Sequence, residues 1–261
     1  MIDLDKIWFR YEHSDWVLKG LSAKIRPGFN ALVGANGAGK STLLKIIIGA
    51  LKPMNGKVTV ENRVIHSISD ALGIISYVPT NPRSFIIGPT VETDFEKAIK
   101  FAKRDLAILD DLMEHEIIKA IKAKKIFHLS EGEARITAII SAYLLGTKVL
   151  LLDEPTIGLD KKYREFLMSI FEKIKRDTII LVASNDLRLV AYADELLFLH
   201  EGTIKRQGTP KEVLYDPLFI KVIGQSDIVA FIHQVQKTIQ IKKVATPVEL
   251  SALLKELVQG D

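Results

Sequence analysis

A glycine-rich run that ends in lysine and serine is the part of the sequence whose chemistry is best defined. Glycines let the backbone curl so that successive N–H groups point at one anion, and a helix that begins there adds the positive end of its dipole. The run consists of Gly34, Ala35, Asn36, Gly37, Ala38, Gly39, Lys40, Ser41 and Thr42. In such a run the lysine reaches the β- and γ-phosphates of a nucleotide, and the serine hydroxyl binds Mg²⁺. We therefore predict a cradle for the triphosphate, with Lys40 at the phosphates and Ser41 at the metal.

The segments on either side of the cradle match what such a motif requires. Residues 29–33 form an apolar run typical of a buried strand, and residues 43–48 have the pattern of a helix. A glycine-rich turn without a ligand is the alternative interpretation. Such a turn does not require a lysine and a serine in this register directly after a strand.

Two adjacent acids follow a second buried strand. Asp153 and Glu154 come directly after the apolar residues 149–152, at the carboxyl end of the strand, where open α/β sheets bind their ligands. Asp153 suits a Mg²⁺ ligand, direct or through water, and Glu154 suits the group that polarises an attacking water. A helix cap or a solvated turn is the alternative for an isolated acid pair. The cradle upstream favours the catalytic interpretation.

The pattern of apolar runs predicts the fold that must position these groups. Runs at residues 29–33, 149–152 and 179–183 each lead into a helix-like segment, and this alternation of strand and helix is typical of a parallel α/β sheet. A short alternating run at residues 57–60 lies between turn signals and predicts antiparallel strands near the start of the chain. We expect an α/β protein with a mixed sheet.

Two helical regions accompany the predicted sheet. Residues 91–127 have a helical pattern without a strand candidate, so we predict a helical subdomain at about residues 90–146, inserted in a domain of residues 1–208. Thr209 to Glu212 and Thr246 to Glu249 each combine an N-cap threonine, a proline at the first helical position and a glutamate that closes a capping box. These two helix starts predict a C-terminal helical extension over residues 209–261.

Composition narrows the class of protein. The 261 residues are 48% hydrophobic and 26% charged, as in ordinary globular proteins, and the absence of cysteine excludes disulfides, thiolate metal sites and thiol nucleophiles. The net charge of +4 is spread along the chain, so we expect no nucleic-acid partner. The N-terminal residues lack the order of a secretory signal, and the apolar runs are far shorter than the ~20 residues that span a bilayer. Any role at a membrane must therefore come through a partner.

A third motif resembles the signature sequence of ABC ATPases. It comprises Leu129, Ser130, Glu131, Gly132 and Glu133, just upstream of the strand before Asp153. Ser130 and Glu133 also have the spacing of a capping box, and both interpretations can hold together. The resemblance extends to residues 157–160, which look like that family's D-loop ending in Asp160, and to Tyr11, whose ring would stack on adenine.

The resemblance implies a P-loop ABC-ATPase fold and a head-to-tail dimer with two ATP molecules between the subunits, each with Mg²⁺. In that arrangement Ser130 and Gly132 bind the γ-phosphate held by the partner, with Glu133 beside them at the nucleotide, and Asp160 lies at the nucleotide interface. A helix N-terminus aimed at phosphate suits this role.

Finer likeness points to a subgroup of the family. Residues 77–82, 88–92, 208–213 and 246–250 look like the cobalt, nickel and vitamin importers called energy-coupling factor systems. That likeness implies an ATP-binding and hydrolysing subunit that is cytoplasmic and peripheral on the inner face of the cell membrane. It also implies an integral membrane transporter subunit that reads the substrate, and import as the direction of transport.

The sequence departs from the family at positions that matter for turnover. Thr80 stands where relatives have a glutamine near Mg²⁺, and its shorter hydroxyl can still bind metal or water. Asn185 stands at the switch histidine and can bind a γ-phosphate oxygen, but it cannot become cationic. The signature carries two glutamates, Glu131 and Glu133, whose charge should weaken the ATP sandwich. We hypothesise a subunit that binds ATP, hydrolyses it slowly by itself, and pairs with a more active partner in a heterodimer.

Two other functions are compatible with these motifs. A non-transport ABC ATPase acting on DNA or ribosomes usually carries long coiled-coil insertions or a second ATPase domain, and this sequence has neither. A regulatory subunit that binds ATP to drive assembly without hydrolysis is favoured by Thr80 and Asn185 and opposed by Glu154.

Overall fold

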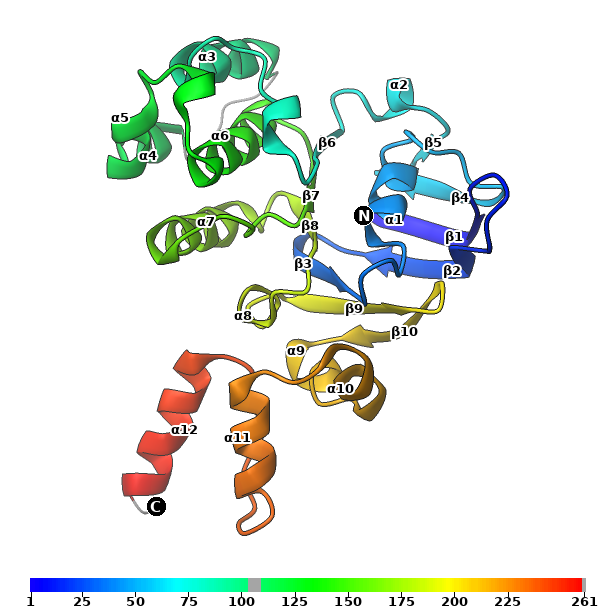
Figure 1. Cartoon of the computed structure of the whole chain (residues 1–261), viewed down its shortest axis with the longest axis vertical. Coiled ribbons are helices and arrows are strands. Elements are labelled where there is room, and N and C mark those ends of the chain that lie inside the picture. The colour runs from blue at the N-terminus through cyan, green and yellow to red at the C-terminus, as the bar shows by residue number, and fades with distance from the viewer. Residues whose placement is uncertain (103–108, 260–261) are drawn as a thin grey trace.

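A computed structural model describes residues 1–102 and 109–259 as two β-sheets covered by helices (Figure 1). The strands are β1 Ile2–Phe9, β2 Leu18–Ile25, β3 Gly28–Val33, β4 Asn55–Val60, β5 Arg63–Ile65, β6 Ile75–Val78, β7 Val149–Asp153, β8 Ile179–Ala183, β9 Glu195–His200 and β10 Thr203–Gly208. The helices are α1 Lys40–Ile47, α2 Ile68–Ala71, α3 Val91–Phe101, α4 Leu109–Glu114, α5 Glu116–Ile121, α6 Glu131–Leu144, α7 Lys161–Ile174, α8 Leu187–Val190, α9 Pro210–Val213, α10 Pro217–Ile223, α11 Asp227–Val235 and α12 Pro247–Gln259.

The larger sheet has six strands in the order β10-β9-β3-β8-β7-β6. Strands β9, β3, β8, β7 and β6 are parallel, and β10 joins the edge antiparallel to β9, so the sheet is mixed as predicted. Every residue of β3, β7 and β8 is buried, which is why these strands are continuous apolar runs in the sequence.

The register of the parallel strands brings their carboxyl ends together. Ala183 at the end of β8 lies opposite Leu32 of β3 on one side and opposite Asp153 of β7 on the other. The loops that follow these three strands therefore start side by side at one edge of the sheet. This edge holds the glycine-rich run and the acid pair.

The N-terminal strands form a second sheet of their own. It is antiparallel, with the order β2-β1-β4-β5, and its tight β4–β5 turn has left-handed backbone at Glu61 and Asn62. We expected antiparallel strands here, but as part of a single mixed sheet. The alternating pattern predicts a strand with one buried face, and the buried face of this sheet packs with α1 against the larger sheet instead of extending it.

The two faces of the larger sheet support separate hydrophobic cores. Val149 and Leu151 of β7 pack with α1 and the antiparallel sheet, whereas Leu150 and Leu152 pack with α3, α6 and α7. Successive side chains of a strand point to opposite faces, so one continuous apolar strand supplies both cores. Helices α3 to α6 lie together beside the sheet (Figure 1). The predicted helical subdomain also includes residues 103–108, which lie outside the described residues.

The C-terminal helices project from the sheet on the side of β10 (Figure 1). Both predicted capping boxes are formed: Thr209 pairs with Glu212 at the start of α9, and Thr246 pairs with Glu249 at the start of α12. The Tyr215 hydroxyl donates to the Val244 carbonyl over 2.7 Å and ties the segment before α12 back to the segment after α9. Within residues 1–102 and 109–259, no helix is both long enough and apolar enough to cross a membrane.

Candidate active site

The glycine-rich run connects β3 to α1, with left-handed backbone at Gly37 and Gly39. Gly39 caps the helix with φ 103°, a conformation that residues with a Cβ rarely adopt. At Gly34 the constraint is space, because a Cβ would lie 2.4 Å from the Leu199 carbonyl oxygen. Glycine at these positions permits the loop to curl around the N-terminus of α1, a backbone shape in which successive amides can point at one anion.

Lys40 is buried in the first turn of α1, and its Nζ donates to the Gly34 carbonyl over 2.6 Å. Burial lowers the pKa of this ammonium, whereas the nearby carboxylates of Glu154 and Asp153 act in the opposite direction. An ammonium has three donors. A phosphate group beside the loop would supply the further acceptors that a buried cation needs.

The loop borders a pocket of about 430 Å³, a size typical of small-molecule sites. Its lining consists of Tyr11, Val17, Ala35, Asn36, Gly37, Ala38, Gly39, Lys40, Ser41, Thr42 and Glu154. The pocket therefore brings together most of the residues predicted to bind nucleotide. Tyr11 is held at its edge, because its hydroxyl bonds with Thr42 Oγ1 over 3.0 Å and its ring packs edge-on against Phe9. The residue is 44% exposed, which leaves its ring accessible for stacking.

Asp153 ends β7 with one carboxylate oxygen in need of a partner. The residue is 4% exposed, and Oδ2 accepts a bond from the Tyr77 hydroxyl over 3.4 Å. Its Oδ1 has no hydrogen-bond partner among the described residues. A buried carboxylate oxygen without a partner is unfavourable unless a cation binds it. The free oxygen of Asp153 therefore suits a divalent metal ion, and the Ser41 hydroxyl in the neighbouring pocket would be a second ligand.

Glu154 follows directly in a left-handed conformation, with φ 50°. Such backbone in a residue other than glycine costs roughly 1–3 kcal/mol and is frequent at functional sites. Its N–H donates to the Ala183 carbonyl over 2.8 Å, and its Oε2 accepts from the Ser184 hydroxyl over 2.9 Å. Burial raises the pKa of this carboxyl, although the Ser184 bond and the Lys40 charge oppose the shift. A raised pKa suits a group that takes a proton near neutral pH.

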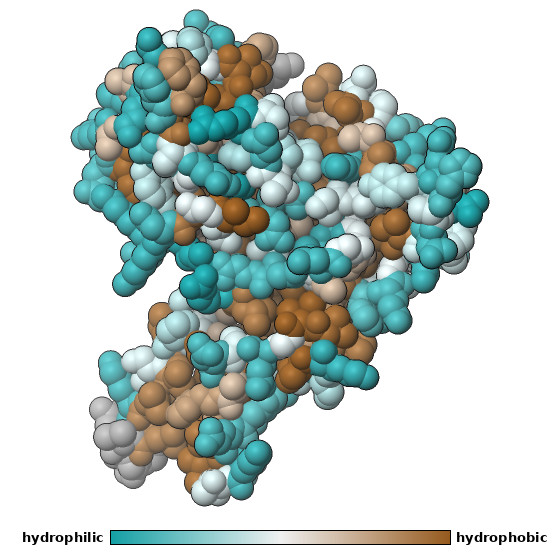
Figure 2. Space-filling view, viewed as in Figure 1, coloured by the Kyte–Doolittle hydropathy of each residue, from teal (hydrophilic) through white to brown (hydrophobic). Residues whose placement is uncertain are grey.

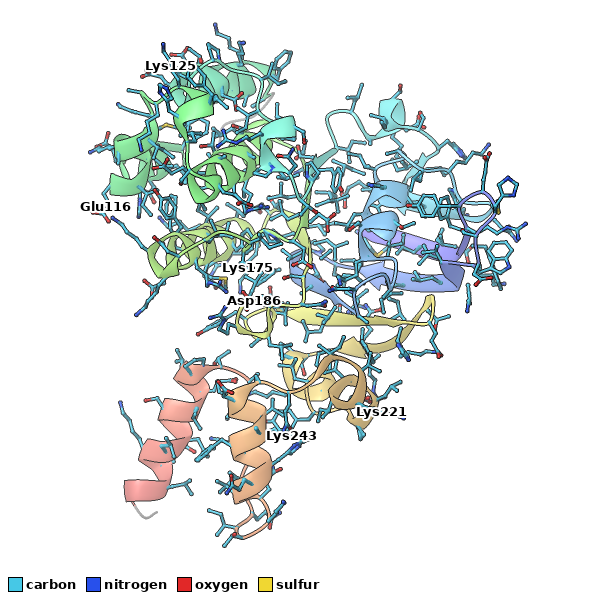
Figure 3. The ribbon with its side chains drawn as sticks, in the orientation of Figure 1. Glu116, Lys125, Lys175, Asp186, Lys221 and Lys243 are labelled. Atoms are coloured by element: carbon cyan, nitrogen blue, oxygen red, sulfur yellow. The ribbon has the colours of Figure 1, made fainter. Side chains whose placement is uncertain are left out.

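The segment after β8 contributes more residues than sequence reasoning identified. Asn185, the predicted switch residue, accepts a bond from the Gly34 N–H over 3.3 Å. Asp186, labelled in Figure 3, caps α8, pairs with Arg164 and accepts a bond from the Thr156 hydroxyl over 3.2 Å. Ser184 and Asp186 were missed because a serine and an aspartate after a strand are typical of any loop. Only their contacts with the acid-pair loop reveal their role.

The signature segment begins α6 and lies outside the phosphate pocket of its own chain. Ser130 and Glu133 form the predicted capping box, with the Ser130 N–H donating to Glu133 Oε2 over 2.9 Å. Burial acts to raise the pKa of the Glu133 carboxyl, but the bonds from Lys124 and the Ser130 N–H lower it overall. Gly132 packs closely on residues 157–160, because a Cβ there would lie 2.9 Å from the Gly158 carbonyl oxygen.

Like Gly34, Asp153 and Asn185, two further predicted residues lie outside the pocket lining. Asp160 is exposed and caps α7, with its Oδ1 accepting from the Tyr163 N–H over 2.9 Å. Thr80 is also exposed, and its carbonyl accepts a bond from Arg135. Their predicted roles at the partner interface and at the metal stay predictions. No group of three or more His, Cys, Asp or Glu within the described part of the chain could hold a metal by itself.

Comparison with known proteins agrees with this geometry. The profile of the family described as ABC transporter matches residues 18–157, which is more than half of the chain. The chain therefore belongs to the ABC transporter family, as an ATP-binding and ATP-hydrolysing subunit.

Curated relatives include the energy-coupling factor transporter ATP-binding protein EcfA of Methanocaldococcus jannaschii, 32% identical over 83% of this chain and 81% of that protein. The EcfA2 protein of Lactococcus lactis subsp. cremoris is 32% identical over 98% of this chain and 97% of its own length.

Solved structures show the same fold. The protein cbiO1 of Clostridium perfringens, described as part of the ABC transporter complex cbiONQ, is 26% identical with a TM-score of 0.69, covering 91% of this chain and 95% of that one. A dimeric ATP-binding cassette with bound ADP and Pi has a TM-score of 0.69 at 22% identity, over 80% of this chain and 98% of its own, and supports the fold alone.

Proposed function

We propose that this chain hydrolyses ATP to power import through an energy-coupling-factor-type transporter, from the inner face of the cell membrane. The observation that carries the proposal is the meeting of Lys40, Asp153 and Glu154 at one edge of the sheet, beside a pocket lined by the glycine-rich run. Relatives named as energy-coupling factor ATP-binding proteins match most of the chain and support the subgroup.

The residues present assign the steps of hydrolysis. The amides around Gly37 and Gly39, with the Lys40 ammonium, hold the triphosphate. Ser41 and Asp153 would hold Mg²⁺, which neutralises charge on the β- and γ-phosphates when bound. Thr80 is the third candidate at the metal and would act through its hydroxyl.

Glu154 is the proton acceptor in this mechanism. A water oxygen attacks the γ-phosphorus, the bond from that phosphorus to the bridging oxygen breaks, and ADP leaves with the bond's electron pair. The Glu154 carboxylate takes the proton that the water loses, and the Ser184 hydroxyl keeps the carboxylate in place. The Asn185 amide can donate to a γ-phosphate oxygen but supplies no positive charge.

The position of the signature segment supports a head-to-tail dimer. Ser130, Gly132 and Glu133 lie outside the chain's own pocket, so a second subunit would present the same residues to the nucleotide, with Asp160 at the junction. The two glutamates of the signature are less unfavourable than their charge alone predicts. Glu131 pairs with Arg135 over 3.2 Å, and Glu133 pairs with Lys124 over 2.8 Å.

The C-terminal helices provide a surface that a second ATPase subunit could cover. Apolar side chains are exposed on α11 and α12, and Figure 2 shows hydrophobic residues gathered over these two helices. They are Phe231, Val248, Leu254 and Leu257. We propose that this surface helps to hold the pair of subunits together, as a homodimer or as the slower half of a heterodimer.

The helical region provides a surface for the membrane subunit. A pocket of about 730 Å³ lies between α3, α6 and the segment around Phe85. At this pocket, Ile87 is 81% exposed and Phe101 is 72% exposed. Two large apolar side chains exposed beside one groove are typical of a protein contact. We propose that the integral membrane partner docks here.

Purification of the tagged chain with its partners tests the proposal. We expect an identified multi-span membrane protein and an ATPase subunit to copurify. Ile87→Asp should remove the membrane protein and leave ATP binding intact, whereas Met54→Asp, an exposed apolar position on the antiparallel sheet side, should leave the complex intact. Copurification with ribosomal or chromosomal proteins instead would favour a non-transport ABC ATPase.

A regulatory subunit that binds ATP without hydrolysing it is the second candidate. The asparagine at position 185 favours it, because an amide cannot offset charge on the γ-phosphate. A single-turnover assay with the purified chain separates the two functions. Formation of one ADP per bound ATP supports an enzyme, and unchanged ATP after many hours supports the regulatory role.

A further inference from the structure

Arg135 is a buried cation whose contacts lie around the hydrolytic site. It belongs to the second turn of α6 and is 1% exposed. A buried guanidinium is costly unless its donors are satisfied, so its partners indicate what it is there to hold.

The partners of Arg135 come from three separate segments. Its Nη2 donates to the Thr80 carbonyl after β6 over 3.0 Å, and its Nη1 donates to the Glu154 carbonyl after β7 over 3.2 Å. Its Nη2 also bonds with Glu131 Oε1 over 3.2 Å, in the first turn of its own helix. Its Nε has no hydrogen-bond partner among the described residues.

This pattern differs from that of an arginine that only neutralises an acid. Among the described residues, the carboxylate that hydrogen-bonds to Arg135 is the mostly exposed Glu131, whereas its two carbonyl partners follow the neighbouring parallel strands β6 and β7. The planar fork of a guanidinium can reach both carbonyls at fixed directions, which a lysine ammonium cannot do. The Glu154 carbonyl is one end of a peptide held in left-handed backbone, so its bond to Arg135 helps to fix the direction of the carboxylate.

We propose that Arg135 is a positioning residue for ATP hydrolysis, which holds the Glu154 loop and the Thr80 loop in fixed relation to the signature end of α6. The proposal rests on the function proposed above. A shift of α6, when the signature meets a nucleotide on the opposite subunit, would then move the carbonyls of both loops. Arg135 in this way links the signature segment, which the chain presents to the partner's nucleotide, with the hydrolytic site of its own chain.

Substitution of Arg135 separates positioning from mere support of the fold. Arg135→Lys keeps the charge and loses the fork, and Arg135→Met keeps the apolar volume and removes the charge. We expect kcat for ATP to fall by ~10- to 10²-fold in both, the cost of a small misplacement of a catalytic group. The Kd for ATP measured by calorimetry should stay within about twofold, because the phosphate cradle is untouched.

Two further variants complete the kinetic test. Arg206→Lys is the matched control, because Arg206 pairs with Asp216 far from the site, and its kcat should equal that of the parent protein. Glu131→Gln alters a mostly exposed side chain, so it keeps the test open should neither Arg135 variant fold. It loosens only one anchor of the guanidinium, so hydrogen–deuterium exchange of residues 79–82 and 153–158 in the protein without nucleotide should rise.

Hydrogen–deuterium exchange of the free protein gives a readout independent of turnover. In Arg135→Lys, exchange should rise in residues 79–82 and 153–158 and stay unchanged in α12. The proposal is overturned when the Arg135 variants keep the parent kcat, or, in their place, when Glu131→Gln keeps the parent exchange in residues 79–82 and 153–158. It is also overturned when kcat, ATP affinity and thermal midpoint all fall together. If the parent protein itself does not bind ATP, the result would instead contradict the proposed function.

Discussion

The Asn185 side-chain amide donates from Nδ2 to Oδ1 of Asn36 over 3.2 Å, joining the end of β8 to the phosphate loop. Its own Oδ1 accepts the bond from the Gly34 N–H. The residue at the switch position therefore contacts the phosphate loop through both ends of its side-chain amide, and it is neutral. A histidine at the same place could bring a positive charge to the γ-phosphate.

Restoring the two family residues should speed hydrolysis. We predict that the double variant Asn185→His and Thr80→Gln raises kcat by ~10- to 10²-fold, because loss of one transition-state contact typically costs ~10²- to 10³-fold. Steady-state phosphate release, measured with and without the partner ATPase, checks this. Equal rates for the double variant and the parent, with and without the partner ATPase, would show that Asn185 and Thr80 do not slow hydrolysis.

Replacing the proton acceptor should stop hydrolysis without loss of stability. We predict that Glu154→Gln lowers kcat by at least ~10²-fold, since general base catalysis contributes this much. Because burial raises the pKa of Glu154, the ionised carboxylate is unfavourable in the folded protein. The amide of Glu154→Gln carries no charge, so its thermal midpoint at pH 7.5 should exceed that of the parent.

The difference in thermal midpoint between Glu154→Gln and the parent protein should depend on pH. A carboxyl whose folded pKa exceeds its unfolded value favours folding at low pH, and this contribution is lost as pH rises through the folded pKa. The advantage of Glu154→Gln should therefore shrink on acidification and be largest above the folded pKa. Parent kcat/KM, which reports the pKa values of the free enzyme, should fall as pH drops through the same pKa. A midpoint difference that grows on acidification would contradict the assignment.

Tyr11 should contribute through its ring. We predict that Tyr11→Ala weakens ATP binding by ~3- to 10-fold, the usual worth of an aromatic contact. Tyr11→Phe keeps the ring, loses only the bond to Thr42, and should bind ATP nearly as the parent does. Inorganic triphosphate, which has no adenine, serves as the control ligand. An equal loss of affinity for ATP and triphosphate in Tyr11→Ala would rule out stacking.

Much of the fold could be predicted because local patterns determine it. The buried strands β3, β7 and β8, the capping boxes at Ser130 and Thr209, and the family itself follow from short segments of sequence. Periodicity could not assign the N-terminal strands to a separate sheet, since a strand's pattern shows its buried face and not its neighbours.

Long-range contacts explain what sequence reasoning missed at the site. Arg135 is an ordinary helix residue by pattern, yet it reaches Thr80 and Glu154, 55 and 19 residues away. Ser184 likewise meets Glu154 only because β7 and β8 are neighbours in register. The left-handed backbone of Glu154 follows from the same packing and has no local signal.

Binding of Mg-ATP measured by isothermal titration calorimetry tests the central claim most directly: the backbone amides around Gly37 and Gly39, with Lys40, hold the triphosphate. We predict saturable heat for the parent protein and for Lys52→Ala, an exposed lysine outside the loop. Lys40→Ala should bind at least ~10²-fold more weakly, because a charge-assisted contact to phosphate is lost. No heat from the folded parent protein, or undiminished binding by Lys40→Ala, would contradict the account.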